Sequence, residues 1–490
     1  MAQRWHDLLD HQAKTQGTVR ALRDSLGTEW SWSDFQAASE AAGDVLRDHG
    51  VKVGDRVVLL VENCGAALAF LYGTSRLGAS VIPFNARQTP AELQRVLDHA
   101  EPSAIVMMSA VSQNASDHAE RMGAKKVSGA FGDVHVLGMQ GTPEDSDDVA
   151  VILYTTGTTG APKGVMLTHD NLCFGGRASA NLRWMVPQDL IYGVLPISHV
   201  FGLASVVTAS SYRGAELLLD SRFDVGRLHG ALQNGVTLLS AVPQMHALLM
   251  QYVKEQGHSQ LGSDMLRYVS SGGAPLDPAW KRAAEAFYGV PLQNGYGMTE
   301  TTAGISATQH IEANDDISCG PALPGVEVKV LDDAPEGELL TRGGHVMKGY
   351  FRAPEITSEV LADDGWFRTG DLGKIDVDGR VHILGRSKEL IIHGGFNVYP
   401  PEVEGVLSDH PQVIQAAVVG HLVDGDEKVL GFCEISEQDK PDLDDLKAWA
   451  AEQLVGYKRP YKIILAEKLP AAATGKILKH KLKEIFADQI

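Results

Sequence analysis

Residues 154–165 read YTTGTTGAPKGV, and they follow directly on the apolar run VAVIL at residues 149–153. The β-branched run predicts a buried strand. The three glycines allow the chain after it to turn its N–H groups toward a bound anion. The threonine hydroxyls and the charge of Lys163 add to such a site, so we expect a strand followed by a polyphosphate-binding loop. The spacing is not that of the Walker A motif, and taken alone these residues also fit a flexible surface loop.

The residues before this loop alternate between helical and strand patterns. Thr89 followed by Pro90 is a start signal for one of the helices. Helices are expected at residues 33–50, 64–78 and 89–102, and strands at residues 53–63, 79–85 and 104–109. This alternation predicts an α/β fold in which helices cover both faces of parallel sheets.

The pattern changes twice toward the C-terminus. From about residue 318, short strands separated by Gly and Asp turns predict a β-rich subdomain. From about residue 388 to residue 490, strand and helix patterns predict a compact α+β unit. A chain of 490 residues exceeds one ordinary core. We therefore expect an N-terminal domain at residues 1–386 and a C-terminal domain at residues 387–490.

The composition narrows the class of protein. A formal net charge of −19 argues against nucleic acid or an anionic membrane as a general partner. The N-terminal residues lack the apolar core of a signal peptide, and no apolar run reaches the roughly eighteen residues of a membrane span. The cysteines are scattered without a CxxC pair, which favours reduced thiols in a cytoplasmic protein over disulfides or a metal site. They are Cys64, Cys173, Cys319 and Cys433.

Four other stretches point to a bound nucleotide. The acid of NGYGMTE (294–300) suits Mg²⁺, which prefers oxygen ligands beside phosphates, and its tyrosine suits a purine face. The acid of FRTGD (367–371) suits ribose hydroxyls. SSGGAPL (270–276) is a glycine-rich turn after a strand, and the C-terminal AAATGKILKHKL (471–482) carries Lys476 in a small loop.

Together these motifs resemble those of the acyl-adenylate-forming enzymes, which include acyl-CoA synthetases, adenylation domains and firefly-type luciferases. The resemblance covers nearly the whole chain, with the motifs in the expected order. It implies a large N-terminal adenylation domain with parallel sheets and a β-rich subdomain. A small, mobile α+β C-terminal domain would follow. It also implies ATP, Mg²⁺ and coenzyme A as cofactor and co-substrates.

The resemblance assigns the nucleotide site residue by residue. The threonines of the first loop and Lys163 would hold the β- and γ-phosphates, Tyr296 would stack on adenine, and Glu300 would bind Mg²⁺. Read alone, Arg386 also fits a structural ion pair. The ATP-binding set is Thr155, Thr156, Gly157, Thr158, Thr159, Lys163, Gly273, Ala274, Asn294, Tyr296, Gly297, Thr299, Asp371, Ile383 and Arg386.

The resemblance also assigns the reacting groups and the acyl site. Lys476 would bridge the substrate carboxylate and the α-phosphate, Thr299 would contact the α-phosphate, and Glu300 would act through Mg²⁺. His199 would gate or orient the carboxylate, although a packed core histidine is the alternative. For His246, pocket lining and core packing are equally open. The predicted acyl pocket comprises His199, Val200, Phe201, Met245, His246, Gly272 and Gly304.

The C-terminal domain would supply the hinge and the thiol site. Lys388 matches the family's hinge position. Gly394, Gly395, Lys458 and Arg459 match regions that contact coenzyme A, although the last two also fit ordinary surface charges.

Two features of the pattern limit the acid that such an enzyme would activate. Gly295 stands where malonate-activating relatives carry an arginine, which disfavours a dicarboxylate. HVFGLASVV (199–207) lacks the aspartate of amino-acid-activating relatives. The expected substrate is thus a short- or medium-chain fatty acid or an aryl acid, joined to coenzyme A as a thioester. Adenylation for a carrier protein, a light-emitting reaction and a non-catalytic nucleotide-binding module are the alternatives, and a homodimer is left open.

Overall fold

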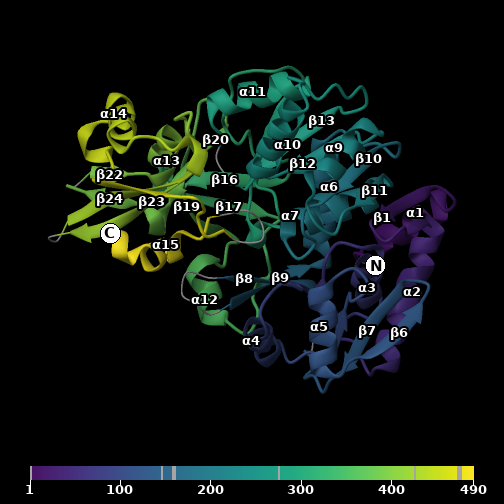
Figure 1. Cartoon of the computed structure of the whole chain (residues 1–490). Helices are drawn as coiled ribbons and strands as arrows, with labels where there is room; N and C mark the ends of the chain where they lie inside the picture. The colour runs from purple at the N-terminus through teal and green to yellow at the C-terminus, as the bar shows by residue number, and fades with distance from the viewer. Residues whose placement is uncertain are drawn as a thin grey trace.

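The computed structural model describes residues 3–144, 147–156, 162–273, 276–394, 396–423, 426–471 and 477–490. The chain up to about residue 350 forms two large sheets with their helices (Figure 1). The C-terminal elements, coloured yellow-green to yellow, lie together at one end of the molecule beside β19 and β20 (Figure 1).

The helices and strands expected before the glycine-rich loop are confirmed. The three helices are α2 (Trp32–Asp48), α3 (Gly65–Arg76) and α4 (Pro90–Ala100). The three strands are β3 (Arg56–Val61), β4 (Ser80–Asn85) and β5 (Ala104–Met107). Thr89 caps α4: its side chain accepts from the Glu92 N–H while the Glu92 side chain accepts from the Thr89 N–H.

The strand predicted before the loop is β8, and it belongs to the first large sheet. The order is β18-β9-β8-β4-β3-β5-β7-β6. The sheet is parallel in the middle, from β8 to β5, whereas both margins are antiparallel. In these margins the pairs β8–β9 and β6–β7 are antiparallel hairpins. The new strands are β6 (Lys125–Gly129), β7 (Gly132–Gly138), β8 (Val149–Thr156), β9 (Pro162–Thr168) and β18 (Gly349–Tyr350).

The second large sheet repeats this plan with the order β15-β14-β13-β12-β10-β11-β1-β2. It is parallel from β14 to β1, with one antiparallel strand at each edge. Its strands are β1 (Arg20–Asp24), β2 (Glu29–Ser31), β10 (Leu190–Gly193), β11 (Glu216–Leu219), β12 (Leu238–Ala241), β13 (Tyr268–Gly272), β14 (Leu292–Tyr296) and β15 (Ser306–Ala307).

Helices pack around these two sheets. The remaining helices of this part are α1 (Asp7–Gln16), α5 (Gln113–Met122), α6 (His169–Leu182), α7 (Val200–Gly202), α8 (Ala209–Arg213), α9 (Val225–Gln233), α10 (Pro243–Glu255), α11 (Pro278–Tyr288) and α12 (Pro354–Val360).

The β-rich subdomain is an antiparallel sheet of order β16-β17-β19-β20. The unit after it holds the hairpin β21–β22, the sheet β23-β24-β25 and three helices. The bounds are β16 (Val326–Val330), β17 (Gly337–Gly343), β19 (Phe367–Ile375), β20 (Val381–Arg386), β21 (Ile391–His393), β22 (Phe396–Val398), β23 (Val413–Val423), β24 (Asp426–Ile435), β25 (Lys462–Ala466), α13 (Pro400–Ser408), α14 (Leu443–Gln453) and α15 (Lys479–Ile485). The predicted fold class is confirmed.

One apolar core joins the two large sheets and includes Leu59 of β3, Leu217 of β11 and Tyr268 of β13. A buried amide fixes the ends of the strands across this junction. The Asn63 side chain donates to the carbonyls of Gly193 (3.0 Å) and Leu195 (2.9 Å). Such a fully satisfied polar contact sets the position of one sheet against the other, and the site described below lies on elements of both.

Two further expectations concern the whole chain. No helix among the described residues is both long and apolar enough to span a membrane. All four cysteines are free thiols. Burial raises the pKa of each to about 12, so they are protonated near neutral pH.

Candidate active site

The β8–β9 hairpin presents the first group of predicted phosphate ligands. Thr155 of β8 lies directly opposite Lys163 of β9 in the antiparallel register. Opposite residues point to the same face of a hairpin, so the hydroxyl and the ammonium share one side. Gly157, Thr158 and Thr159 lie outside the described residues, between the two strands.

Glu300 reaches this hairpin from the second sheet. It sits in a short 3₁₀ turn (Thr299–Thr301) after β14, and the residue is only 9% exposed. Its carboxylate accepts from the phenol of Tyr350 at 2.9 Å. The ring of Tyr350 in turn faces the Lys163 ammonium, 5.1 Å from its centroid. One aromatic side chain therefore connects the first motif to the second.

The backbone around Glu300 is strained, as is common at functional sites. Thr302 and Ala303, which follow it, have φ of 49° and 80° although neither is glycine. This bend brings the Ala303 carbonyl so close to Gly297 that a Cβ built there would lie 1.8 Å from the oxygen. Only glycine fits at this position, which explains one of the glycines of NGYGMTE.

The second predicted group, around ribose, meets at β14, β19 and β20. The Tyr296 hydroxyl donates to Asp371 at 2.7 Å, and Arg386 Nε lies 3.0 Å from the other carboxylate oxygen. Burial, with Asp371 as the second cause, raises the pKa of Tyr296 well above its usual value. Burial lowers the pKa of Arg386, but Asp371, Glu389, Tyr296 and Glu300 raise it on balance. The phenol is thus a donor and the guanidinium stays charged.

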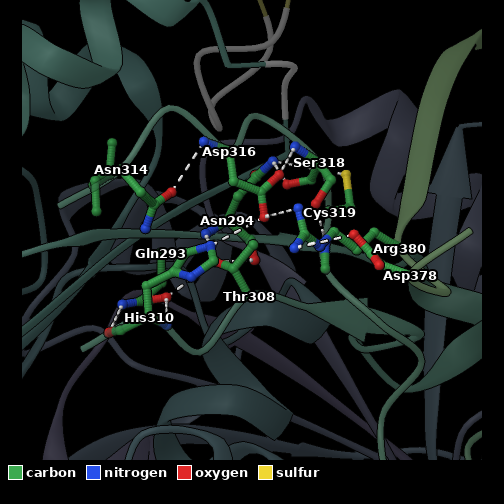
Figure 2. Close-up of polar contacts among 12 residues, drawn as sticks. Gln293, Asn294, Thr308, His310, Asn314, Asp316, Ser318, Cys319, Asp378 and Arg380 are labelled. Carbon is green, nitrogen blue, oxygen red and sulfur yellow. Dashed lines mark hydrogen bonds and ion pairs between the residues drawn. The ribbon is translucent and has the colours of Figure 1, made fainter. Parts of the chain in front are cut away.

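Asn294 anchors β14 from behind. Its amide donates to the Ser318 carbonyl at 3.0 Å and lies 3.7 Å from Cys319 Sγ. Figure 2 shows how this contact continues into a polar network with Asp316 and Arg380 on the segment before β16 and the turn before β20. The side chain of Asn294 is therefore engaged within the protein, and its predicted contact with ATP is untested.

Two further predicted ATP contacts flank the same strands. Ile383 packs with Tyr296 around one small apolar cluster of the β-rich sheet. Gly273 follows β13 directly and has a φ of 84°, a conformation that favours glycine. Ala274 lies outside the described residues.

The predicted acyl-site stretch begins a broken helix. His199 caps α7, since its Nδ1 accepts from the Phe201 N–H at 3.2 Å, which leaves the proton of the neutral ring on Nε2. A π-helical segment (Leu203–Thr208) follows, a feature that is frequent at functional sites. Val200 is buried, and Phe201 lies against Gly272, where an added Cβ would meet the ring at 3.1 Å.

His246 lies in the core beside this stretch. The residue is fully buried; Nδ1 is 2.7 Å from the Tyr288 hydroxyl and Nε2 is 3.3 Å from the Ser270 carbonyl. Burial lowers its pKa to about 4, so the ring is neutral. Both ring nitrogens already have partners, which favours the core alternative for His246. Its neighbour Met245 packs against the core that joins the two large sheets and against a second apolar cluster that includes Leu239 of β12 and Val269 of β13.

Gly304 borders the turn after Glu300. An added Cβ at Gly304 would lie 2.7 Å from a Leu323 methyl group. Phe201 and Leu323 thus lie so close to Gly272 and Gly304 that a larger residue at either position would crowd them. This closeness explains the glycine at both positions.

In the C-terminal unit, Lys388 lies in the turn (Ser387–Glu389) that follows β20 directly. Gly394 follows β21 with φ of 58°. Lys458 pairs with Glu402 at 2.6 Å, and the Arg459 guanidinium donates to the carbonyls of Leu454 and Ala451 at the end of α14. Gly395 and Lys476 lie outside the described residues.

Tyr350 is the residue that sequence reasoning missed. It belongs to a strand of two residues, which is too short for any periodicity to reveal. Its partners are 187 and 50 positions away along the chain.

Comparison with known proteins decides the family. Residues 9–351 match the family described as AMP-binding enzyme, and residues 402–476 match the AMP-binding enzyme C-terminal domain. The chain belongs to the AMP-binding enzyme family. It is therefore an AMP-forming acid–thiol ligase, a class of enzymes that form acyl adenylates.

Individual relatives of this AMP-binding enzyme carry different names. It is 32% identical to a feruloyl-CoA synthase of Amycolatopsis sp, over 94% of each chain. It is 30% identical to the long-chain-fatty-acid–CoA ligase FadD13 of Mycobacterium tuberculosis, over 95% of each chain. An o-succinylbenzoate coenzyme A synthetase from Bacillus subtilis, solved with ATP and magnesium, superposes with a TM-score of 0.83 at 27% identity. That match covers 97% of this chain and 99% of the other.

Proposed function

We propose that this AMP-binding enzyme is an ATP-dependent acyl-CoA ligase for a carboxylic acid with an uncharged tail. The observation that carries the proposal is the meeting of Lys163, Tyr350 and Glu300 beside the Tyr296–Asp371–Arg386 contacts. Segments far apart in the sequence thereby supply two cations, two acids and two aromatic rings.

These groups fit ATP and magnesium. Glu300 is a buried carboxylate. Arg386 is near enough to interact electrostatically with Glu300, but its ion pair is with Asp371. A buried acid in this position suits Mg²⁺, which would neutralise phosphate charge when bound. Thr155, Thr156, Thr158, Thr159, Thr299 and Lys163 would bind phosphate oxygens. Asp371 would accept from ribose hydroxyls.

In the first step an oxygen of the acid would attack the α-phosphorus of ATP. A new O–P bond forms, the bond to the β-phosphate breaks, and pyrophosphate leaves. Two anions approach each other, so the barrier is largely electrostatic. Lys476 would lower it by contacting both, while His199 Nε2–H would donate to the acid.

In the second step the thiolate of coenzyme A would attack the carbonyl carbon of the adenylate, and AMP would leave. We propose that the C-terminal domain, residues 387–490, turns about Lys388 between the steps. Support for such a hinge comes from the short turn at Ser387–Glu389, which joins β20 to the C-terminal unit, because hinges are usually a few residues at the end of an element. Gly394, Gly395, Lys458 and Arg459 would border coenzyme A, and the last two would first have to leave their present partners.

The residues around the acyl site support an uncharged tail. Val200, Phe201, Met245, Gly272 and Gly304 carry no charge, and His246 is neutral within the core. Gly295 supplies no charged side chain, and a Cβ added there would meet only the Ser306 carbonyl and Ala307. A short- or medium-chain fatty acid or an aryl acid fits such walls. The cysteines are free thiols, which supports a location in the cytoplasm, where thiols are kept reduced.

The test is pyrophosphate release from the purified protein with ATP and Mg²⁺. The panel would contain acetate to dodecanoate, benzoate, cinnamate, 4-coumarate, phenylacetate and malonate, each with and without coenzyme A. We expect one apolar acid to be preferred and coenzyme A to raise turnover. Preference for malonate would contradict the proposal. Adenylate formation without a response to coenzyme A would instead favour the alternative, an acyl-AMP ligase that loads a carrier protein.

A further inference from the structure

Tyr350 lies between two groups of opposite charge. Its hydroxyl donates to Glu300 Oε1 at 2.9 Å, and the Lys163 ammonium lies 5.1 Å from its ring centroid, within cation–π distance. The residue is 7% exposed. The same side chain thus touches the proposed metal ligand and the proposed phosphate ligand.

The backbone holds Tyr350 in this place from three sides. β18 pairs with β9 so that Tyr350 lies opposite Val165, two residues from Lys163 on the same face of the sheet. The Tyr350 N–H donates to Thr357 at 2.9 Å. Met347, three residues earlier, donates to the Glu300 carbonyl at 2.8 Å. These contacts fix the backbone of Tyr350 relative to β9 and to the turn that carries Glu300.

The chemistry of a phenol suits this position. It donates one proton to one carboxylate oxygen, which fixes the carboxylate's rotation and leaves lone pairs of the group for a cation. A tyrosine phenol is protonated near neutral pH, so it is present here as a donor. The Lys163 ammonium lies over the ring, and no salt bridge joins it to Glu300 among the described residues.

We propose that Tyr350 is a positioning residue for adenylation: its hydroxyl orients Glu300 toward magnesium, and its ring keeps Lys163 apart from Glu300 and available to phosphate. The inference rests on the proposed function, because it takes Glu300 as the metal ligand and Lys163 as a phosphate ligand. Tyr350 itself contacts neither the acid nor the reacting phosphorus in this scheme.

Two substitutions separate the two contacts. Tyr350→Phe keeps the ring and removes the hydroxyl. We expect the Mg²⁺ concentration for half-maximal ATP–pyrophosphate exchange to rise about tenfold, as for a lost hydrogen bond to a charged group. The KM for ATP at saturating Mg²⁺ and the KM for the acid should stay near wild type. Tyr350→Leu removes the ring as well and should also raise the KM for ATP.

Tyr72→Phe is the matched control, since it removes a buried phenol that donates to Ser211 at 2.7 Å in α8, away from this site. It should lower the melting temperature without changing the Mg²⁺ response. A Tyr350→Phe enzyme with lower stability but a wild-type Mg²⁺ response would overturn the inference. Glu300→Gln separates a failure of the proposed function from a failure of the inference about Tyr350. If Glu300→Gln keeps the wild-type Mg²⁺ response, Glu300 is not the metal ligand, and both the metal assignment and the inference are wrong.

Discussion

The proposed nucleotide side and the proposed acyl side of this site are built in opposite ways. On the nucleotide side, Lys163, Glu300, Tyr296, Asp371 and Arg386 converge through charges and hydrogen bonds. On the acyl side, Gly272 and Gly304 leave space beside Phe201 and Leu323, and the polar groups of His246 bond within the core.

This difference explains why the reaction is easier to infer than the substrate. Charge and hydrogen-bond demands of a triphosphate restrict both residue type and geometry, so they leave motifs in the sequence. An apolar pocket is defined by volume, and many combinations of side chains give the same volume. Relatives of about 30% identity accordingly share the ligase reaction but have names that differ in the acid.

The largest expected effect tests the nucleotide side. Lys476→Ala should slow adenylation by about a hundred- to a thousandfold, because it removes a charge that would stabilise the transition state. ATP–pyrophosphate exchange measures this step, and thioester formation from supplied acyl adenylate should change much less. Lys481→Ala, an exposed lysine on α15, is the control. Equal loss in both half-reactions would contradict the assigned role.

The second prediction tests the wall behind the acyl side. The pKa of His246 is about 4 when folded, below the ordinary 6.5, so the unfolded chain binds more protons between these values. The neutral, buried state of His246 therefore contributes to the free energy of unfolding above pH 6.5, and this contribution is lost as the pH falls through about 4. The contribution amounts to about 3 kcal/mol.

His246→Gln should remove that part of the pH dependence, measured by urea unfolding at several pH values. His169 and His345, whose pKa values burial also lowers to about 4, should keep the rest. Parallel curves for the variant and the wild type would show that His246 is not a buried neutral histidine.

The third prediction concerns ribose. Asp371→Asn removes the charge that pairs with Arg386 and accepts from Tyr296, so the KM for ATP should rise about tenfold or more. The KM for the acid should not change, and steady-state kinetics at saturating second substrate separate the two. Asp376→Asn, which removes an acid paired with His382 after β19, is the matched control. A change in the acid KM alone would argue against a nucleotide contact.

The smallest expected effect is the most informative about specificity. Gly272→Ala adds a methyl group whose carbon would lie 3.1 Å from the nearest atom of the Phe201 ring. We expect kcat/KM to fall about tenfold for wide or long acids and little for acetate, as for one methylene in an apolar pocket. The KM for ATP is the internal reference. Uniform loss for all acids would show that Gly272 does not border the tail.

The sequence by itself determined the order of elements and the kind of reaction. Local patterns suffice for helices such as α4, where Thr89, Pro90 and Glu92 form a complete start signal within four residues. The motifs also identify a polyphosphate, because its chemistry demands threonines, a lysine and acids at fixed spacing. These signals are carried by neighbours in the chain, so they can be seen without a fold.

The tertiary structure alone decided which motif residues meet and which side chains turn away. Tyr350 connects Lys163 with Glu300 only because β18 pairs with β9. The side chains of Asn294 and His246 form hydrogen bonds within the protein, and sequence periodicity does not predict such contacts. Gly297 must be glycine because a carbonyl six residues later folds back onto it. Such contacts depend on the packing of distant segments, and the sequence holds them only through the fold.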